Sequence, residues 1–216
     1  MGDLAPSIIA ADFAHLADEL DRVARFAQLW HVDVMDGHYV PNLTIGPMIV
    51  EAIASVSNLP QDVHLMITNP AETWEWYAKA GAARIAFHPE TAPDPLALLR
   101  EMRSAGIGPG LAVNPELDAD AMRPFLDDVD LLIVMSVHPG FSGQQFIPDA
   151  VPKLRRLREM AGPDLDLVID GGVNEKTAPQ CVEAGASVLV SASAIFGADD
   201  PAAVAQRLKA IADGKQ

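Results

Sequence analysis

Short apolar runs alternate along the chain with longer segments in which apolar residues recur at helical spacing. The runs recur about every 20 to 35 residues, and they begin at Leu4, Leu29, Asp62, Ala83, Gly108, Leu131, Leu165 and Ser187. One segment between two runs has apolar residues three or four positions apart, at Phe13, Leu16, Leu20, Val23 and Phe26. Such spacing gives a helix one apolar face, whereas the short runs are typical of buried strands. The pattern therefore predicts eight strands, each followed by a helical segment.

Glycines mark where several of the predicted helices end. Gly81, Gly106 and Gly185 each stand shortly before the next apolar run, and glycine takes up the left-handed conformation that ends helices at little cost. Strands that alternate with helices pair in parallel through right-handed crossovers. Eight such units predict an α/β fold, a single (β/α)8 TIM barrel that fills residues 1–216 as one domain. A doubly wound open sheet is the alternative, but "SIIAADF" after the first strand lacks its glycine-rich nucleotide fingerprint.

Composition narrows the classes of partner. The formal net charge is −15 and the sequence pI is about 4.6, which argues against nucleic acid and anionic membranes because both require a basic surface. The apolar runs are far shorter than the roughly 18 residues of a membrane helix. One cysteine, Cys181, excludes an internal disulfide, and the first residues have no signal-peptide pattern. We expect a soluble cytoplasmic protein with no membrane partner and no nucleic-acid partner.

Unusual polar residues gather at the predicted ends of the strands, where (β/α)8 barrels carry their active sites. They are Ser7, His31, Asp33, His64, His88, Asn114 and Asp170. His31 and Asp33 are two positions apart and would point to the same side of a strand; His64 and Met66 repeat this relation on the next one, with Asp62 deeper on the same face. Imidazole nitrogen and carboxylate oxygen together suit Zn²⁺, Fe²⁺, Mn²⁺ or Co²⁺.

Four of these residues favour a metal site over a purely structural role. His31, Asp33, His64 and Asp170 would face one low-dielectric space, where unpaired charges are costly unless a metal binds them. A histidine at a strand end is more often a hydrogen-bonded structural residue, and we interpret His88 and His138 in that way.

Asp33 and Asp170 also suggest a reaction. Strands 2 and 7 are three steps apart around an eight-stranded ring, so the two carboxylates would face a bound ligand from nearly opposite sides. One could remove a proton from a carbon centre and the other could return a proton on the opposite face. A carbon acid beside a carbonyl is weaker than a carboxylic acid by roughly 15 pKa units, a gap on the order of 20 kcal/mol. A metal ion on both oxygens of the resulting enediolate would supply much of the stabilisation needed.

Methionines and glycines complete the predicted barrel mouth. Met35, Met66 and Met135 stand at the ends of strands 2, 3 and 6; they either fill the core or form an apolar cap that keeps water off an intermediate. The loops after strands 6, 7 and 8 read "HPGFSGQ", "DGGV" and "SASAIFG". Loops after strands 7 and 8 are the usual phosphate site of this fold. They contain no Lys or Arg, so backbone dipoles and hydroxyls would hold the anion.

Together these segments resemble the ribulose-phosphate 3-epimerase family. The resemblance runs from "PSIIAADF" through "HVDVMDGHYVPNLTIGP", "DVHLM", "MSVHPGFSGQQFIP" and "DGGV" to "SAIFG". It covers nearly the whole chain and implies a barrel of the ribulose-phosphate-binding type. It also implies 3-epimerisation of D-ribulose 5-phosphate to D-xylulose 5-phosphate by an isomerase of carbohydrate metabolism and the pentose phosphate pathway, acting through an enediolate.

The resemblance further implies the roles of individual residues. The metal ligands would be His31, Asp33, His64 and Asp170, and the acid–base pair would be Asp33 and Asp170. Substrate contacts would come from Ser7, His64, Met35, Met66, Met135, Gly140, Phe141, Ser142, Gly143, Gly171, Gly172, Ala192 and Ser193. Each subunit would hold one divalent ion, Zn²⁺ first, with Fe²⁺, Mn²⁺ or Co²⁺ as alternatives. The segment "MDGHYVPNLTIGP" would be a mobile flap, with Asp36 and Gly37 in its turn, and the protein would be a dimeric or hexameric homo-oligomer.

Two departures keep other hypotheses open. The family usually has glycine where this chain has Ser142, and glycine before serine where it has Ala192; alanine would be strained if that position needs a positive φ. "FHPET" and "VNPE" resemble segments of allulose-6-phosphate 3-epimerases, the alternative activity. A lyase or synthase of the decarboxylase type would need an Asp-x-Lys-x-x-Asp arrangement that "DVMDGH" lacks. A phosphosugar binder without activity is the third hypothesis.

Overall fold

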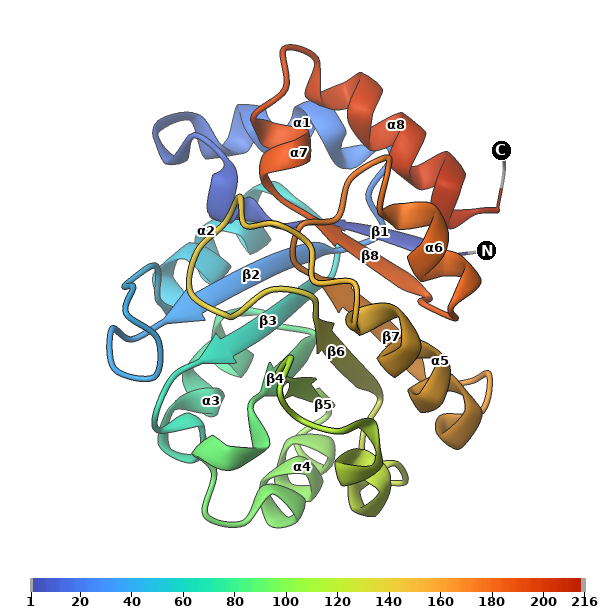
Figure 1. The fold of residues 1–216 in the computed structure, drawn as a ribbon. Helices are drawn as coiled ribbons and strands as arrows, with labels where there is room; N and C mark the ends of the chain where they lie inside the picture. Colours follow the sequence, from blue (N-terminus) through green and yellow to red (C-terminus); the bar gives the residue numbers. More distant parts are fainter. Residues whose placement is uncertain (1, 215–216) are drawn as a thin grey trace.

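Eight parallel strands form one sheet in the computed structural model, which describes residues 2–214 (Figure 1). The strands are β1 Asp3–Pro6, β2 Trp30–Met35, β3 Gln61–Met66, β4 Arg84–Phe87, β5 Gly108–Val113, β6 Leu131–Met135, β7 Asp166–Asp170 and β8 Val188–Ser191. Their order is β1-β8-β7-β6-β5-β4-β3-β2, and a parallel bridge between Ser7 and His31 joins the two end strands. The sheet is therefore a nearly closed barrel, and the predicted TIM-barrel fold is confirmed.

Helical segments connect the strands on the outside of the barrel (Figure 1). The α-helices are α1 Leu16–Ala24, α2 Pro47–Val56, α3 Pro70–Ala80, α4 Pro95–Ser104, α5 Ala150–Ala161, α6 Ala178–Glu183, α7 Ser193–Phe196 and α8 Pro201–Ala212. The 3₁₀ turns are η1 Ile8–Ala10, η2 Phe13–His15, η3 Pro89–Thr91 and η4 Ala119–Phe125, and η4 alone provides the helical connection between β5 and β6.

Local sequence explains where the helices begin and end. The side chain of Asp94 accepts a hydrogen bond from the amide of Ala97 at the start of α4, and Pro95 follows it at the first helical position. Gly81 ends α3 in the left-handed conformation with φ +111°, as its place before β4 predicts. Phe13 differs from the prediction: it belongs to η2, before α1, and its side chain is 42% exposed, so it does not join the buried face of that helix.

The core consists of two apolar layers. A large cluster fills the space between the sheet and the helices, and a second cluster, which includes Ala5, Ala86, Ala112, Ile133 and Val168, lies apart from it. Ile133 on β6 is two residues from Met135, and Val168 on β7 is two residues from Asp170. Each therefore points to the same face of the sheet as that site residue. Both faces of the strands are buried, which explains why the strands are continuous apolar runs in the sequence.

Among the residues described, no helix is both long and apolar enough to span a membrane.

Candidate metal centre

Four predicted ligands meet at the carboxyl ends of three strands. His31 and Asp33 come from β2, His64 from β3 and Asp170 from the last position of β7. One nitrogen or oxygen from each lies within 4.8 Å of the others. Both imidazoles are fully buried and Asp33 is 5% exposed. The structure thus brings the predicted set together.

The distances between the donor atoms fit one bound ion. Asp33 Oδ1 is 3.3 Å from His31 Nε2 and 3.4 Å from His64 Nδ1, while Asp170 Oδ2 is 3.8 Å and 3.7 Å from the same two nitrogens. Donors on a tetrahedron with bonds of about 2.0–2.1 Å would be roughly 3.3–3.4 Å apart. Neither nitrogen has a hydrogen-bond partner within the described chain. Buried polar atoms without partners are costly, so a cation that takes their lone pairs explains them.

The electrostatics of the cluster are those of a paired set of charges. Burial alone would raise the pKa of the Asp33 carboxyl, but His31 and His64 outweigh burial and hold that pKa well below its usual range. Burial alone would lower the pKa of both imidazoles; Asp33 and Asp170 reverse the effect, so both pKa values lie above the ordinary value. A divalent cation bound here would take the place of protons on these nitrogens, because imidazole binds a metal through its unprotonated nitrogen.

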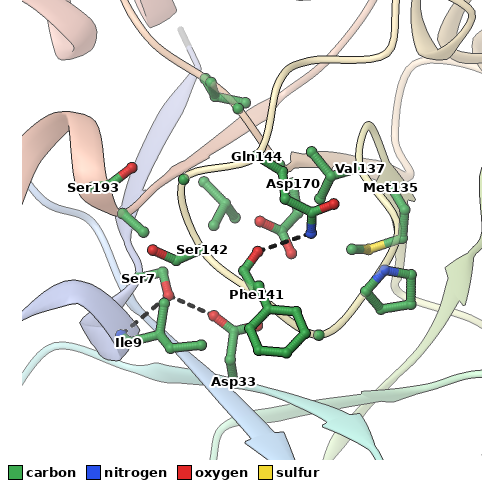
Figure 2. A pocket seen from close by; sticks show the side chains of 18 of the residues that line it. Ser7, Ile9, Asp33, Met135, Val137, Phe141, Ser142, Gln144, Asp170 and Ser193 are labelled. Carbon is green, nitrogen blue, oxygen red and sulfur yellow. Dashed lines mark hydrogen bonds between the residues drawn. The ribbon is translucent and has the colours of Figure 1, made fainter. Parts of the chain in front are cut away.

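A second set of residues surrounds the ligands. Ser7 donates a hydrogen bond to Asp33 Oδ2 at 2.5 Å, as Figure 2 shows. On the inner side, Asp62 Oδ2 lies 3.6 Å from His31 Nδ1 and accepts a hydrogen bond from Arg84 at 3.2 Å. Asp62 therefore lies deeper on the same face, as predicted. Burial alone would raise the pKa of the Asp62 carboxyl, but Arg84, together with His31 and His64, outweighs burial and lowers that pKa.

The two histidines interpreted as structural differ in their positions. His88 is fully buried, with Nε2 3.0 Å from His64 Nε2. Burial and the charge of His64 hold the pKa of His88 well below its ordinary value. His138 has an exposed side chain and pairs with Glu116 at 3.0 Å. His138 is not part of the cluster, whereas His88 contacts one of its members.

A cavity of about 280 Å³ opens beside the cluster (Figure 2). Its lining includes these predicted site residues: Ser7, Asp33, Met35, Met66, Met135, Gly140, Phe141, Ser142, Gly143, Asp170, Gly171, Gly172, Ala192 and Ser193. His31 and His64 lie behind this lining, in the buried part of the cluster. Met35 and Met66 also pack against Val40 in a small apolar cluster, so the methionines both fill the core and line the cavity.

Paired glycines shape the far wall of the cavity. Gly171 has φ +112° and a Cβ there would be 2.5 Å from the Val137 side chain; Gly172 has φ +62° and a Cβ would be 2.8 Å from the amide nitrogen of Phe146. Only glycine fits these positions without moving the neighbouring loop. Ala192 has φ −110°, so the strain considered for alanine does not arise there.

Sequence reasoning missed part of the cavity lining. The additional residues are Ile9, Val137, Pro139, Gln144, Val173, Asn174, Val190 and Ala194. Gln144 Nε2 donates to the carbonyls of His138 and Phe141 and folds the loop after β6; in Figure 1 that loop arches in front of the strands. Asn174 Nδ2 donates to the carbonyl of Gly172. Gln144 and Asn174 could have been predicted, because each stands directly after a glycine-rich segment. Amide side chains in such places often form hydrogen bonds with the backbone of a turn.

The segment after β2 forms a small turn that is closed by an antiparallel bridge between Asp36 and Leu43. Asp36 Oδ1 accepts from the amides of His38 and Tyr39, and Oδ2 accepts from the amide and hydroxyl of Thr68. These bonds outweigh burial and lower the pKa of Asp36 to about 2. Asp36 thus connects the turn after β2 to the segment after β3, and it is not part of the four-residue cluster. Asn42 Nδ2 donates to the carbonyl of Gly140 at 2.6 Å, which connects this turn to the loop after β6.

Comparison with known proteins gives a consistent result. The sequence profile of the ribulose-phosphate 3 epimerase family matches residues 3–196. Ribulose-phosphate 3-epimerase of Mycobacterium tuberculosis (strain ATCC 25618 / H37Rv) is 48% identical, with 95% of this chain and 91% of that protein covered. The protein of the same name from Bacillus subtilis (strain 168) is 43% identical, with 97% and 96% covered. A solved 3-hexulose-6-phosphate synthase has a TM-score of 0.72 at 18% identity, with 97% and 99% covered; this likeness concerns the fold alone.

Proposed function

Because the chain belongs to the ribulose-phosphate 3-epimerase family and is an epimerase, an enzyme of the isomerase class, we propose that it interconverts D-ribulose 5-phosphate and D-xylulose 5-phosphate. The observation that carries the proposal is the buried cluster of His31, Asp33, His64 and Asp170 beside a cavity. Epimerisation at C3 requires removal of a proton beside the ketone and its return on the opposite face. The two carboxylates at the cavity can perform both steps.

His31, Asp33, His64 and Asp170 would hold one divalent cation, Zn²⁺ in the first instance. Such a cation would supply the positive charge that stabilises the two oxygens of an enediolate. A cation held by these four residues would lie at the edge of the cavity, while both imidazoles are buried behind it.

Proton transfer falls to Asp33 and Asp170. Both line the cavity, and they come from strands on different sides of the barrel. One carboxylate accepts the C3 proton, and the other carboxyl delivers a proton to the opposite face of the planar enediolate. Their roles exchange in the reverse reaction. Ser7 supports this role of Asp33, because its hydroxyl donates to Oδ2 and leaves Oδ1 turned toward His31 and His64.

The remaining lining residues position the substrate. Met35, Met66 and Met135 would cover the planar intermediate and exclude water that could protonate it without control. The phosphate would lie against the glycine-rich loops, at Gly140 to Gly143, Gly171, Gly172, Ala192 and Ser193. No Lys or Arg lies among the lining residues of the cavity described. Backbone amides and the hydroxyls of Ser142 and Ser193 would therefore bind the anion.

The experiment that tests the substrate measures kcat/KM for D-ribulose 5-phosphate and D-allulose 6-phosphate side by side, with the metal content of the same sample determined. We expect the pentose phosphate to be turned over with the higher kcat/KM by a sample that contains about one divalent ion per chain. Faster turnover of the hexose phosphate would identify the alternative, allulose-6-phosphate 3-epimerase activity. A metal-free sample that binds phosphate tightly and turns over neither sugar would support the phosphosugar-binder hypothesis. The single domain, the cytoplasmic location and the homo-oligomeric state stay predictions.

A further inference from the structure

His88 follows β4 directly and belongs neither to the four-residue cluster nor to the cavity lining. It is fully buried, and its Nε2 lies 3.0 Å from Nε2 of His64. The other ring nitrogen of His64, Nδ1, faces Asp33 and Asp170. One imidazole thus has a carboxylate cluster on one side and a second imidazole on the other.

Two ring nitrogens at hydrogen-bond distance impose a chemical constraint. One must carry the proton and the other must offer its lone pair, since two N–H groups or two lone pairs would repel each other. A cation bound by Nδ1 of His64 requires the lone pair there, and a neutral imidazole then carries its proton on Nε2. His88 Nε2 must be the acceptor.

We propose that His88 is a positioning residue: it accepts the Nε2–H of His64 and thereby fixes both the tautomer and the ring orientation that turn the His64 Nδ1 lone pair toward the metal. This inference rests on the metal site of the proposed function and adds a residue to it. In that role His88 would contact neither the metal nor the sugar.

The surroundings of His88 suit an acceptor held in one orientation. The Tyr39 ring lies 4.8 Å from the imidazole, centroid to centroid, and the amide and hydroxyl of Thr91 both donate to the His88 carbonyl. His88 Nδ1, which then carries the proton, has the Glu90 carboxylate 3.9 Å away. The Tyr39 hydroxyl and Asn114 Nδ2 both donate to that same carboxylate, at 2.7 Å each.

The two metal-facing imidazoles are supported in different ways. Nδ1 of His31, the ring nitrogen that faces away from the cluster, lies 3.6 Å from the carboxylate of Asp62. A carboxylate in this place is common behind a metal-binding histidine. His64 has a neutral imidazole in the corresponding place. Loss of such an outer partner typically weakens metal binding by about 10- to 100-fold, which sets the size of the effect to measure.

The test compares Zn²⁺ affinity, by competition with a chelator, for the metal-free wild type and two variants. His88→Leu fills the site with an apolar side chain and removes the acceptor, whereas His88→Gln keeps an acceptor oxygen on a chain of similar length. We expect H88L to bind Zn²⁺ about 10- to 100-fold more weakly than the wild type does. In H88Q most of the lost affinity should return. Nitrogen-15 NMR of the Zn²⁺-loaded wild type should show His64 protonated on Nε2 alone, and this measurement needs no variant to fold.

Phe87→Leu is the matched control. Phe87 is the buried neighbour of His88 on the outer, helix-packed side of the strand, so its truncation disturbs local packing without touching His64. Unchanged Zn²⁺ affinity in H88L, equal losses in H88L and F87L, or a His64 proton on Nδ1 would each overturn the inference. If the wild type binds no divalent metal, the metal site itself is wrong, and that outcome is distinct from a failure of His88 alone.

Discussion

Asp33 and Asp36 are three residues apart and have entirely different surroundings. Asp33 is buried and lies between two imidazoles, with one oxygen bonded to Ser7. Asp36 lies past the end of β2, and its two oxygens accept four hydrogen bonds, two from the amides of the turn and two from Thr68 after β3. Alternation along a strand explains the division: positions 31 and 33 share the inner face, and position 36 is already in the loop. The same residue type therefore belongs to the buried cluster in one place and holds a turn in the other.

Asp170→Asn tests the acid–base role at this scale. Asparagine keeps the size of the side chain but can neither accept nor deliver the C3 proton. We expect kcat to fall by about 10²- to 10⁴-fold when the enzyme is assayed at saturating Zn²⁺ with its metal content measured. Asp164→Asn changes an exposed aspartate on the approach to β7 and should leave kcat unaltered. A metal-loaded D170N enzyme with wild-type kcat would rule out Asp170 as a proton carrier.

Metal uptake should depend on pH in a defined direction. The pKa values of His31 and His64 lie above the ordinary value in the metal-free protein, so protons compete with the cation for both nitrogens. Apparent Zn²⁺ affinity should therefore rise with pH through the neutral range, and binding should release protons. Calorimetry in buffers of different ionisation enthalpy measures the number released. An affinity that does not change from pH 6 to pH 8, without proton release, would contradict this prediction.

At the scale of elements, the loops after β6, β7 and β8 together line the cavity in which we place the substrate. Gly172 is packed against the backbone of the loop after β6, near Phe146, and Ser136 on that side donates to the carbonyls of Asp170 and Gly171. The loop after β6 is also connected to the turn after β2 through Asn42. Close backbone approach at these points means that a small change in one loop displaces the next.

Gly172→Ala tests this coupling. The new Cβ would be 2.8 Å from the Phe146 nitrogen at a φ of +62°, so the loops must separate where the phosphate would bind. We expect KM for the phosphosugar to rise at least about tenfold, with a loss of stability on the order of 1–3 kcal/mol. Gly106→Ala is the control, because it has a comparable φ of +82° and open space around it. If G106A and G172A raise KM equally, the phosphate loop is not the cause.

Sequence periodicity predicted the barrel because each strand is buried on both faces and each helix on one, which leaves distinct patterns. The four-residue cluster was predictable for a similar reason: strand alternation places His31 with Asp33, and parallel strands end at one edge. Contacts set by loops were not predictable in this way. The packing of Gly172 against Phe146 and the approach of His88 to His64 depend on tertiary distances. Phe13 lies outside the predicted helix because a 3₁₀ turn precedes α1.

At the scale of the whole molecule, a charged group ties strands together beneath the site. Arg84 on β4 donates to Asp62 on β3 and to Asp166 on β7, at 3.2 and 2.7 Å. Asp62 is fully buried, and its carboxylate also faces His31. An ion network therefore lies beneath the four-residue cluster, in a barrel whose interior also contains small alanines.

Arg84→Leu should destabilise the protein by about 3–5 kcal/mol, because it leaves Asp62 buried without its cation. The pKa of Asp62 is lowered in the folded state, so its contribution is present above its ordinary pKa of about 4 and is lost as pH falls below it. The difference in unfolding free energy between wild type and R84L should therefore become smaller at acidic pH. Urea unfolding at several pH values measures this. Arg100→Leu removes the ion pair between an exposed arginine and Asp128 and should cost far less, because water screens such pairs. Equal losses of unfolding free energy in the two variants would contradict the role of the buried pair.

We propose that the four-residue cluster binds a divalent cation and that its two aspartates move the C3 proton of D-ribulose 5-phosphate. Solvent-deuterium exchange at C3 tests it directly, with NMR of the sugar after incubation in D₂O. We expect exchange with the metal-loaded protein, none after chelation, and recovery when a divalent ion is restored. An undiminished exchange rate after complete removal of the metal, or no exchange with any restored divalent ion, would contradict it.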